Sequence, residues 1–204
     1  MTLTILSLQQ STPGVPPQSE DDVLLERMRN DDQDAYRLLV ERHIDRAYGL
    51  ALRVLKNTAD AEDVTQDCLI KAWQHRKTWQ AGRAKFETWL YRVIVNRCID
   101  LQRRPKTEWL DDVDEPSDDA PDTVETIQRR QVSNRLEDAM GQLPTQQRTA
   151  LVLSYYENLS NIEIAEILGT TISATESLLK RGRQGLRKLM KRSEGEVRHF
   201  LADQ

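Results

Sequence analysis

Residues 159–187 read LSNIEIAEILGTTISATESLLKRGRQGLR, which is the pattern of two short helices joined by a tight turn. Ser160 can cap the first helix, and Glu163 stands three residues later, as a capping box requires. Gly169 marks the end of this helix, because glycine adopts a positive φ without steric cost. A second helix is expected to begin near Ser173. This arrangement predicts a helix-turn-helix, whose second helix enters a DNA major groove.

The apolar residues of this stretch recur at threes and fours, as one face of a helix requires. In the first helix the expected inward residues are Ile162, Ala165, Ile167 and Leu168. In the second helix they are Thr175, Leu178, Leu179, Leu186 and Leu189. The pattern predicts that each helix packs through a single apolar stripe.

Positive charge gathers on the second helix. Between residues 176 and 192 the basic residues are Lys180, Arg181, Arg183, Arg187, Lys188, Lys191 and Arg192. Seven bases against one acid, Glu176, give +6 on a chain whose net charge is −4. Cations concentrated on one helix of an acidic chain indicate a phosphate-binding surface, so we expect this end to bind DNA. For Lys188–Arg192 a second explanation stays open, since bases near a helix C-terminus also complement its dipole.

The composition favours helices and a reducing compartment. The 204-residue chain holds only eight Gly and seven Pro, which favours an all-α fold of one or two domains. Cys68 and Cys98 fit neither a disulfide framework nor a metal-ligand spacing. No apolar run is long enough to cross a bilayer, and residues 1–8 have no basic segment before them. We expect a cytoplasmic protein with no signal peptide, no membrane insertion, no metal and no cofactor.

The first twenty residues contain three prolines and no helical period, so a disordered leader is expected over residues 1–20. Order should begin where Ser19–Asp22 can cap a helix. That helix carries Val23, Leu24 and Met28.

A long amphipathic helix should follow, capped by Asp34 and buried on one wide face. His43 lies on or beside that face. Because no second histidine stands at ligand spacing, a packing or capping role is expected for it rather than metal binding.

A shorter helix is predicted over residues 61–74, with Asp60 as its cap. Its polar side carries Glu62, Asp63, Gln66 and Asp67. Acids in the first turn stabilise a helix through its dipole. This explanation suits Glu62 and Asp63 better than it suits Gln66 and Asp67.

Aromatic and basic residues alternate between residues 79 and 106. The expected loop holds Trp79, Arg83 and Lys85, and the helix that follows, residues 86–104, carries Arg92, Arg97, Arg103 and Arg104. Aromatic rings for stacking and cations for the backbone describe a surface for single-stranded nucleic acid. Phe86, Trp89 and Leu90 are expected in the core, which leaves Trp79 and Tyr91 as the freer candidates for base stacking.

The segment from Glu108 to Glu125 holds nine acids and no base, together with Pro116 and Pro121. Such a block cannot bury enough apolar area to fold, so it marks the boundary between two domains. Two roles are open for it: a solvated linker, or an anionic mimic of nucleic acid. In the free chain it could also mask the basic helix near the C-terminus.

Helical period returns after the acidic segment, with Val132, Leu136, Ala139 and Met140 on one stripe that ends at Gly141. Pro144 suits the first turn of the next helix, on which Ala150, Leu151, Val152, Tyr155 and Tyr156 are expected to pack. The predicted organisation is a leader (1–20), a helical domain (21–106), a flexible acidic linker (107–126), a helix-turn-helix domain (127–192) and a tail (193–204).

Taken together, these segments resemble a sigma factor of the extracytoplasmic-function (ECF) group of the sigma-70 family. The first signature is DAEDVTQDCLIKAW at residues 60–73, followed by FETWLYRVIVNRCIDLQRR at 86–104. The second is LPTQQRTALVLSYYENLSNIEIAEILGTTISATESLLKRGRQGLRKL at 143–189. The resemblance runs from about Asp31 to Leu189. It implies a sigma-2-like bundle and a sigma-4-like helix-turn-helix domain.

The resemblance also implies roles for the polar surfaces. The helix at residues 60–73 would dock on the clamp of the β′ subunit of core RNA polymerase through Asp60, Glu62, Asp63, Gln66 and Asp67. The −10 promoter element would be melted and read by Trp79, Arg83, Lys85, Arg92, Asn96, Arg97, Asp100, Arg103 and Arg104. The −35 element would be read as duplex by Ser173, Thr175, Glu176, Ser177, Lys180, Arg181, Arg183 and Arg187. The linker would thread the RNA exit channel.

Many relatives carry a base where Glu176 stands, so a carboxylate here either accepts from a cytosine amino group or repels phosphate. The resemblance further implies contacts with the β subunit, promoter DNA and an anti-sigma factor, with stress-responsive initiation as the function and no enzymatic chemistry.

Three functions other than initiation give different expectations for this sequence. A repressor or activator that binds an operator alone would need a dimer surface or a ligand pocket, and no heptad or cavity pattern indicates either. A nuclease would need metal-binding carboxylates, but acids in a proline-broken segment cannot hold metal geometry. An adaptor that mimics a sigma factor would bind polymerase without opening a promoter, and transcription with purified polymerase separates it from an initiation factor.

Overall fold

The structure, a computed structural model, describes residues 19–79, 85–103 and 124–202, and all regular secondary structure in these ranges is helical. The all-α prediction with two helical domains is confirmed. Residues 1–18 of the expected leader, residues 107–123 of the expected linker, and the single residues Arg83 and Arg104 lie outside the described ranges.

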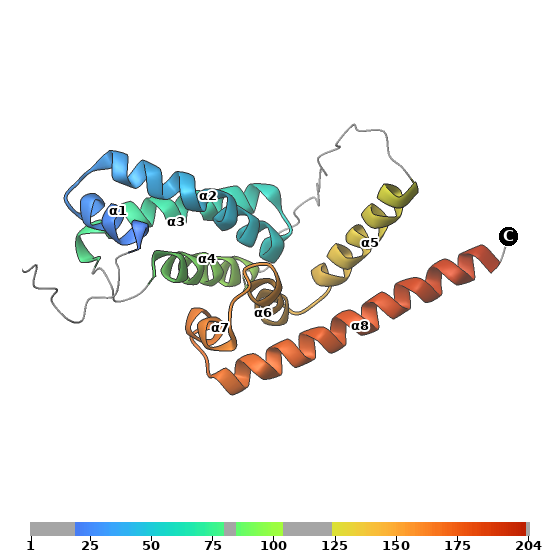
Figure 1. The fold of residues 1–204 in the computed structure, drawn as a ribbon. Helices are drawn as coiled ribbons and strands as arrows, with labels where there is room; N and C mark the ends of the chain where they lie inside the picture. Colours follow the sequence, from blue (N-terminus) through green and yellow to red (C-terminus); the bar gives the residue numbers. More distant parts are fainter. Residues whose placement is uncertain (1–18, 80–84, 104–123, 203–204) are drawn as a thin grey trace, which may run out of the picture.

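The first domain contains α1 (Glu20–Arg29), α2 (Gln33–Leu55), α3 (Thr58–Gln74), the 3-10 turn η1 (Arg76–Thr78) and α4 (Phe86–Arg103). The second contains α5 (Val124–Gly141), α6 (Thr145–Tyr155), α7 (Asn161–Leu168) and α8 (Ile172–Ala202). In the first domain α2 packs on α1, α3 and α4, whereas in the second α8 packs on α5, α6 and α7 (Figure 1).

Polar caps begin the helices of the first domain. Ser19 forms a capping box with Asp22, as expected. The predictions for α2 and α3 were wrong, because Asp32 caps α2 and Asn57 caps α3. An N-cap needs an extended backbone, and Asp32 and Asn57 have ψ of 103° and 124°. Asp34 and Asp60 are already inside the first turn, where they complement the helix dipole.

The His43 ring packs inside the first domain. Its Nε2 lies 2.7 Å from an oxygen of Asp21, and the ring meets Phe86 edge-on at 5.2 Å. The expected packing role is therefore confirmed. These two contacts connect the middle of α2 to α1, through Asp21, and to α4, through Phe86.

Both thiols are buried in the same core. Cys68 on α3 and Cys98 on α4 are free, and burial raises their pKa values from 9.0 to about 11 and about 12. We expect neither to react with an aromatic disulfide reagent at pH 8 until denaturant is added, because the thiolate is the reactive form. Rapid labelling of the native chain would contradict this placement.

The raised thiol pKa values also predict a pH dependence. Between pH 9 and 11 the unfolded chain loses thiol protons that the folded chain keeps, so stability falls as the pH rises through this window. The melting temperature, followed by circular dichroism, should decline less steeply in a variant with both cysteines replaced by alanine.

The helix-turn-helix forms as predicted. Ser160 and Glu163 make the capping box of α7, and Gly169 ends it with φ of 61°. Thr171 accepts a bond from the Ala174 amide at the start of α8. The prediction that Ile162 packs inward was wrong: it is 65% exposed, and Ile164 fills the interior.

The helix before this motif begins one residue later than expected. Pro144 is the N-cap of α6 and precedes the first helical residue. Ala150, Leu151 and Val152 are buried as predicted. Tyr155 and Tyr156 were expected to pack inward but are exposed.

The two domains contact each other. Helix α7 lies against α4, and α6 lies against both α2 and α4 (Figure 1). Nothing in the sequence predicted this contact.

Among the described segments, no helix combines the length and apolar character that a membrane span needs.

Candidate nucleic-acid and protein interfaces

One side of α3 presents acids to solvent. All five residues predicted for polymerase contact are exposed there: Asp60, Glu62, Asp63, Gln66 and Asp67. They span about two turns of α3. They are exposed because the apolar stripe of this helix faces the core and leaves the other side to solvent. The surface is therefore accessible, as its proposed role requires.

A shallow hollow of about 310 Å³ lies on this side of α3. Its lining includes four of the five predicted residues and adds Ile70, which is 53% exposed. Sequence reasoning missed Ile70. The available signal was an apolar residue four positions after Gln66, on a side otherwise made of polar residues. An exposed aliphatic group among acids can give a partner an apolar contact.

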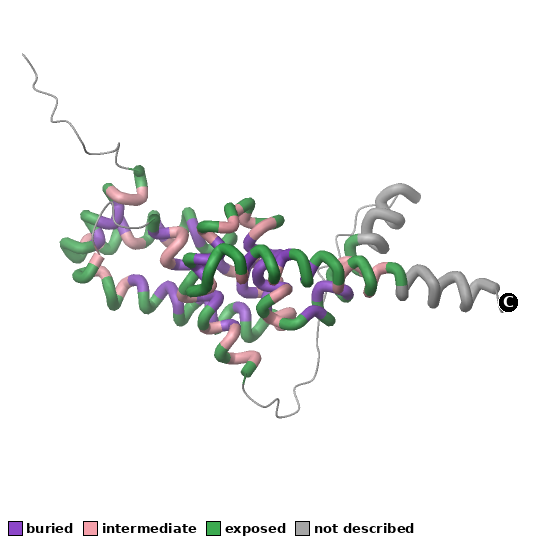
Figure 2. The backbone as a smooth tube through the Cα atoms, turned by 90° about the horizontal axis from the view of Figure 1, so that it is seen from below, coloured by how far each residue is buried: buried purple, intermediate pink, exposed green. Residues whose placement is uncertain are grey.

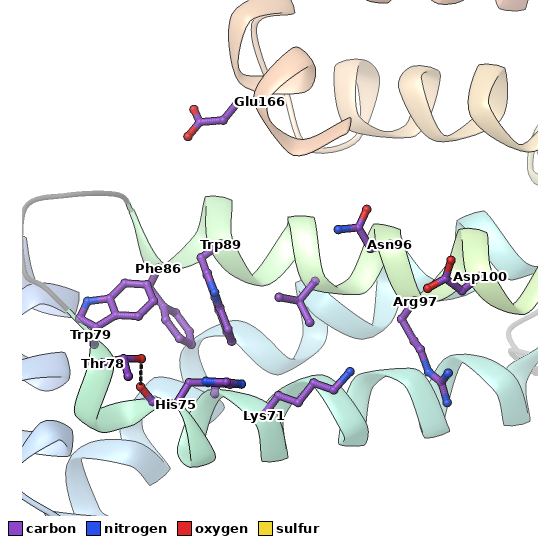
Figure 3. Close-up of a pocket in the computed structure, with 12 residues that line it drawn as sticks. Lys71, His75, Thr78, Trp79, Phe86, Trp89, Asn96, Arg97, Asp100 and Glu166 are labelled. Atoms are coloured by element: carbon purple, nitrogen blue, oxygen red, sulfur yellow. Dashed lines mark hydrogen bonds between the residues drawn. The ribbon is translucent and has the colours of Figure 1, made fainter. Parts of the chain in front are cut away.

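Arg97 joins the acidic surface to α4. Its guanidinium lies 3.3 Å from a carboxylate oxygen of Asp67, and Figure 3 shows the side chain reaching across to α3. Its Nε is buried and has no partner among the described residues. Arg97 therefore already makes an ion pair within the protein.

An aromatic pocket opens where α3, η1 and α4 meet (Figure 3). Its volume is about 740 Å³, and its lining includes Trp79, Phe86, Trp89, Asn96 and Glu166. Trp79 meets the rings of Phe86 and Trp89 at 5.6 and 5.7 Å, in edge-on geometry. The Trp79 Nε1–H is buried without an acceptor among the described residues.

Such a pocket offers contacts with aromatic rings. These are the contacts that an unstacked base can use. Trp79 lines this pocket, and its base-binding role stays a prediction.

The assignment of Tyr91 as a free stacking candidate was wrong. The residue is 1% exposed, and its hydroxyl donates to Glu157 Oε2 at 2.7 Å and lies 3.1 Å from Glu87 Oε1. Burial and the two carboxylates raise the pKa of Tyr91. The ring belongs to the core stripe of α4 with Ile94 and Cys98.

The other described candidates on the −10 surface are accessible. Lys85, Arg92, Asn96, Asp100 and Arg103 are all exposed. Figure 3 shows Asn96 on the side of α4 that faces the second domain.

The first half of α8 carries the residues predicted to read duplex DNA. Seven of them are exposed: Ser173, Glu176, Ser177, Lys180, Arg181, Arg183 and Arg187. Thr175 is 0% exposed and lies on the buried stripe with Leu179, which confirms the inward position that periodicity predicted and shows that the groove-facing role implied by the resemblance was wrong. The spacing of four residues places both on one side of the helix, toward the domain interior.

Helix α8 approaches α6 closely at Gly182. A Cβ built at this position would lie 3.0 Å from Leu151 Cδ1 and 3.3 Å from the Gln147 carbonyl. The absence of a side chain at Gly182 therefore lets α8 pack directly on α6.

An apolar groove of about 620 Å³ lies between α5, α6 and α8. Its floor includes Leu136, Met140, Leu151, Leu186 and Met190, and its rim includes Tyr155, Tyr156, Arg183, Arg187 and Lys191. The exposed tyrosines thus belong to a groove rather than to the core. Sequence reasoning missed this groove, and Arg183 and Arg187 lie beside it as well as on the basic side of α8.

Among the residues with described side chains, no group of three or more His, Cys, Asp or Glu residues is placed to hold a metal ion.

Comparison with known proteins gives two family matches in order along the chain. Residues 39–107 match Sigma-70 region 2, and residues 133–186 match Sigma-70, region 4.

Individual relatives agree with these matches. The chain is 32% identical over 178 residues to the ECF RNA polymerase sigma factor SigW of Bacillus subtilis. The alignment covers 82% of this chain and 95% of the relative. It is also 32% identical over 178 residues to the ECF RNA polymerase sigma-E factor of Haemophilus influenzae, covering 82% and 93%. The structure of CnrH in complex with the cytosolic domain of CnrY aligns with a TM-score of 0.64 and 26% identity, over 85% of this chain and 98% of that chain.

Proposed function

The chain belongs to the extracytoplasmic-function sigma factors of the sigma-70 family. We propose that three separate exposed surfaces bind core polymerase, the −10 element and the −35 element. The acidic side of α3 would bind the β′ clamp of core polymerase. The aromatic pocket and α4 would bind the melted −10 element. The first half of α8 would bind the −35 duplex. The chain itself would carry no catalytic group, and phosphodiester chemistry would belong to the polymerase.

One observation carries the proposal: residues of opposite charge are segregated onto separate exposed helices. The five polymerase-contact candidates stand together on α3, whereas the cations of α8 stand on a different domain. A protein partner with basic residues and a nucleic acid could therefore bind at the same time. Because one chain carries both sites, binding of DNA by α8 becomes effectively intramolecular once polymerase, already at the promoter, holds α3.

The aromatic pocket supports a role in melted DNA. Its volume of about 740 Å³ accommodates a nucleobase, and the rings of Trp79, Phe86 and Trp89 line it. Arg92 and Arg103 on α4, the helix that forms one wall of the pocket, are exposed and can bind phosphates.

An anti-sigma factor is a further proposed partner. The apolar groove beside α8 has aromatic and basic side chains on its rim, which suits an amphipathic acidic helix. The similar chain CnrH was solved with a bound cytosolic domain of another protein. Regulated release from such a partner would make initiation responsive to stress in the cytoplasm.

The test is transcription with purified core polymerase on DNA fragments taken upstream of genes induced by overproduction of the chain. We expect specific transcripts only when the chain is present, since core enzyme alone does not select promoters. A chain that joins polymerase but never opens a promoter would be an adaptor instead. A chain that binds one DNA site without polymerase would be an operator-binding regulator.

A further inference from the structure

The 3-10 turn η1 has little support of its own. It consists of three residues, its N-cap residue His75 makes no side-chain capping bond, and none of its residues is buried. Figure 2 shows the buried residues gathered where helices face one another, and η1 adds none to them. The turn lies against α1 and α3. Its position therefore depends on polar contacts with these neighbours.

The turn carries Trp79 to the aromatic pocket. Trp79 follows η1 directly, and its amide donates to the Arg76 carbonyl at 3.3 Å. The Thr78 hydroxyl donates to the His75 carbonyl at 2.8 Å (Figure 3). The indole then meets the Phe86 ring edge-on at 5.6 Å. The place of Trp79 in the pocket therefore follows from how η1 is fixed.

One carboxylate, that of Asp31, pairs with both cations of η1. Arg76 donates from Nε to Asp31 Oδ1 at 2.6 Å, and the Lys77 ammonium donates to Asp31 Oδ2. The same ammonium donates to the Arg29 carbonyl, at the end of α1, at 3.0 Å. Hydrogen bonds from Lys77 and Arg76 lower the pKa of Asp31, so the carboxylate is charged at neutral pH. A residue 45 positions earlier in the chain thus holds the turn.

Asp31 also occupies an unusual backbone position. It lies in the corner between α1 and α2 with a φ of 66°. Glycine adopts such a φ without steric cost, and aspartate and asparagine tolerate it better than most other residues. A glycine would therefore satisfy the corner equally well but could not hold η1. The conformation of the corner does not by itself require the carboxylate.

Arg76 is oriented before it meets Asp31. Its guanidinium lies over the Trp73 ring at 4.3 Å and donates to the Trp73 carbonyl at 2.9 Å. The Trp73 ring lies 5.1 Å from the ring of Tyr36 on α2. An ion pair between exposed side chains is weakened by the entropy lost when both are ordered. Because Trp73 already orders Arg76, less entropy is lost in this pair.

We propose that Asp31 is a positioning residue for the −10 surface: its carboxylate fixes η1 through Arg76 and Lys77, and thereby holds Trp79 where an unstacked base can meet it. The proposal rests on the proposed function of the aromatic pocket. Asp31 is not among the residues that line this pocket, so it acts through η1. It gives the corner between α1 and α2 a part in promoter opening.

Three substitutions separate the carboxylate from the corner. Asp31→Gly suits the positive φ but removes both contacts, whereas Asp31→Asn tolerates the φ and keeps one oxygen as an acceptor. Asp34→Asn is the matched control, because Asp34 is an exposed acid of the first turn of α2. All three changes add +1 to the net charge, so general attraction to DNA rises equally. A role limited to the corner would make Asp31→Gly at least as good as wild type.

The first measurement is fluorine NMR of the free, full-length chain labelled with 5-fluorotryptophan. Trp79→Phe assigns the Trp79 resonance, and the free amino acid gives the position of a fully solvated ring. We expect Asp31→Gly to shift the Trp79 resonance toward that position, Asp31→Asn to shift it less, and Asp34→Asn to leave it in place. Melting temperatures should change by only a few degrees, because exposed ion pairs contribute little to global stability.

The second measurement is fluorescence anisotropy of polymerase holoenzyme with two DNAs, whose sequence comes from a promoter found in the transcription test. Both contain the −35 duplex, and only one continues into a single-stranded −10 tail. We expect the preference for the tailed DNA to fall about tenfold in Asp31→Gly, less in Asp31→Asn, and not at all in Asp34→Asn. Affinity for the untailed duplex should be equal in all of them, since α8 is unchanged.

The outcomes separate this inference from the proposed function. An unchanged Trp79 resonance in Asp31→Gly, or a shifted resonance with an unchanged preference for the tail, would overturn the positioning role and leave the proposed function intact. A wild-type holoenzyme with no preference for the tailed DNA would instead overturn the assignment of the pocket, and the −10 role of Asp31 with it.

Discussion

Reversing two charges on α3, by Asp63→Arg with Asp67→Arg, is expected to weaken binding to core polymerase about 100-fold, since like charges across an interface cost several kcal/mol. Both carboxylates are exposed, and Asp67 lies 3.3 Å from Arg97. An exposed pair of this kind contributes about 0–1 kcal/mol, so the fold should persist. Fluorescence anisotropy with labelled chain measures the affinity.

A matched control makes the same change of charge elsewhere. Glu41→Arg with Asp45→Arg alters two exposed acids of α2 and adds the same +4 to the net charge. We expect this variant to bind polymerase within a few-fold of wild type. Equal losses in the two double variants would show that net charge, and not the side of α3, governs binding.

Replacing Lys180 or Arg181 by alanine should weaken binding to the −35 duplex by about 1–3 kcal/mol if the side chain contacts base edges. Both residues are exposed in the first half of α8. Arg181 also donates from Nε to the Ser177 carbonyl at 3.3 Å, which orients its guanidinium along the helix. Binding should be measured with polymerase holoenzyme across a series of salt concentrations.

The salt series separates the two kinds of contact. A residue that binds phosphate reduces the salt slope by about one when it is removed, whereas a residue that reads a base leaves the slope nearly unchanged and relaxes specificity at one position. Lys188→Ala is the matched control, because this exposed lysine lies farther along α8. A loss at Lys188 as large as that at Arg181 would argue against a reading role confined to the first half of the helix.

Local sequence signals predicted the start and end of several helices but misplaced two caps. The Ser160–Glu163 capping box and the Gly169 turn were identified correctly because each depends on residues within one or two helical turns. The caps of α2 and α3 were misplaced by two or three residues. Several polar residues in sequence can all cap, and only the backbone conformation decides which one does.

Assignments of side chains to faces were less reliable on α4 and α8, the two helices proposed to bind nucleic acid. Periodicity placed Thr175 inward correctly, but the resemblance assigned it to the groove, and Tyr91 was left as a free ring; both lie on buried stripes. Helical periodicity gives the spacing of a stripe but not its width. A polar residue at the margin can therefore fall on either side, and tertiary packing, such as that of Tyr91 against Glu157, decides its place.

The amino-acid sequence by itself determined that the chain is helical, that it carries two sigma-like regions in order, and where acids and cations are concentrated. These properties depend on composition and on short-range periodicity, which a linear chain displays directly. Only the tertiary structure decided that α7 lies against α4, that Tyr91 meets Glu157 and that the buried Arg148 donates to Gln102. Such contacts join residues 46 to 66 positions apart through polar side chains, which look the same in sequence whether they face water or another domain.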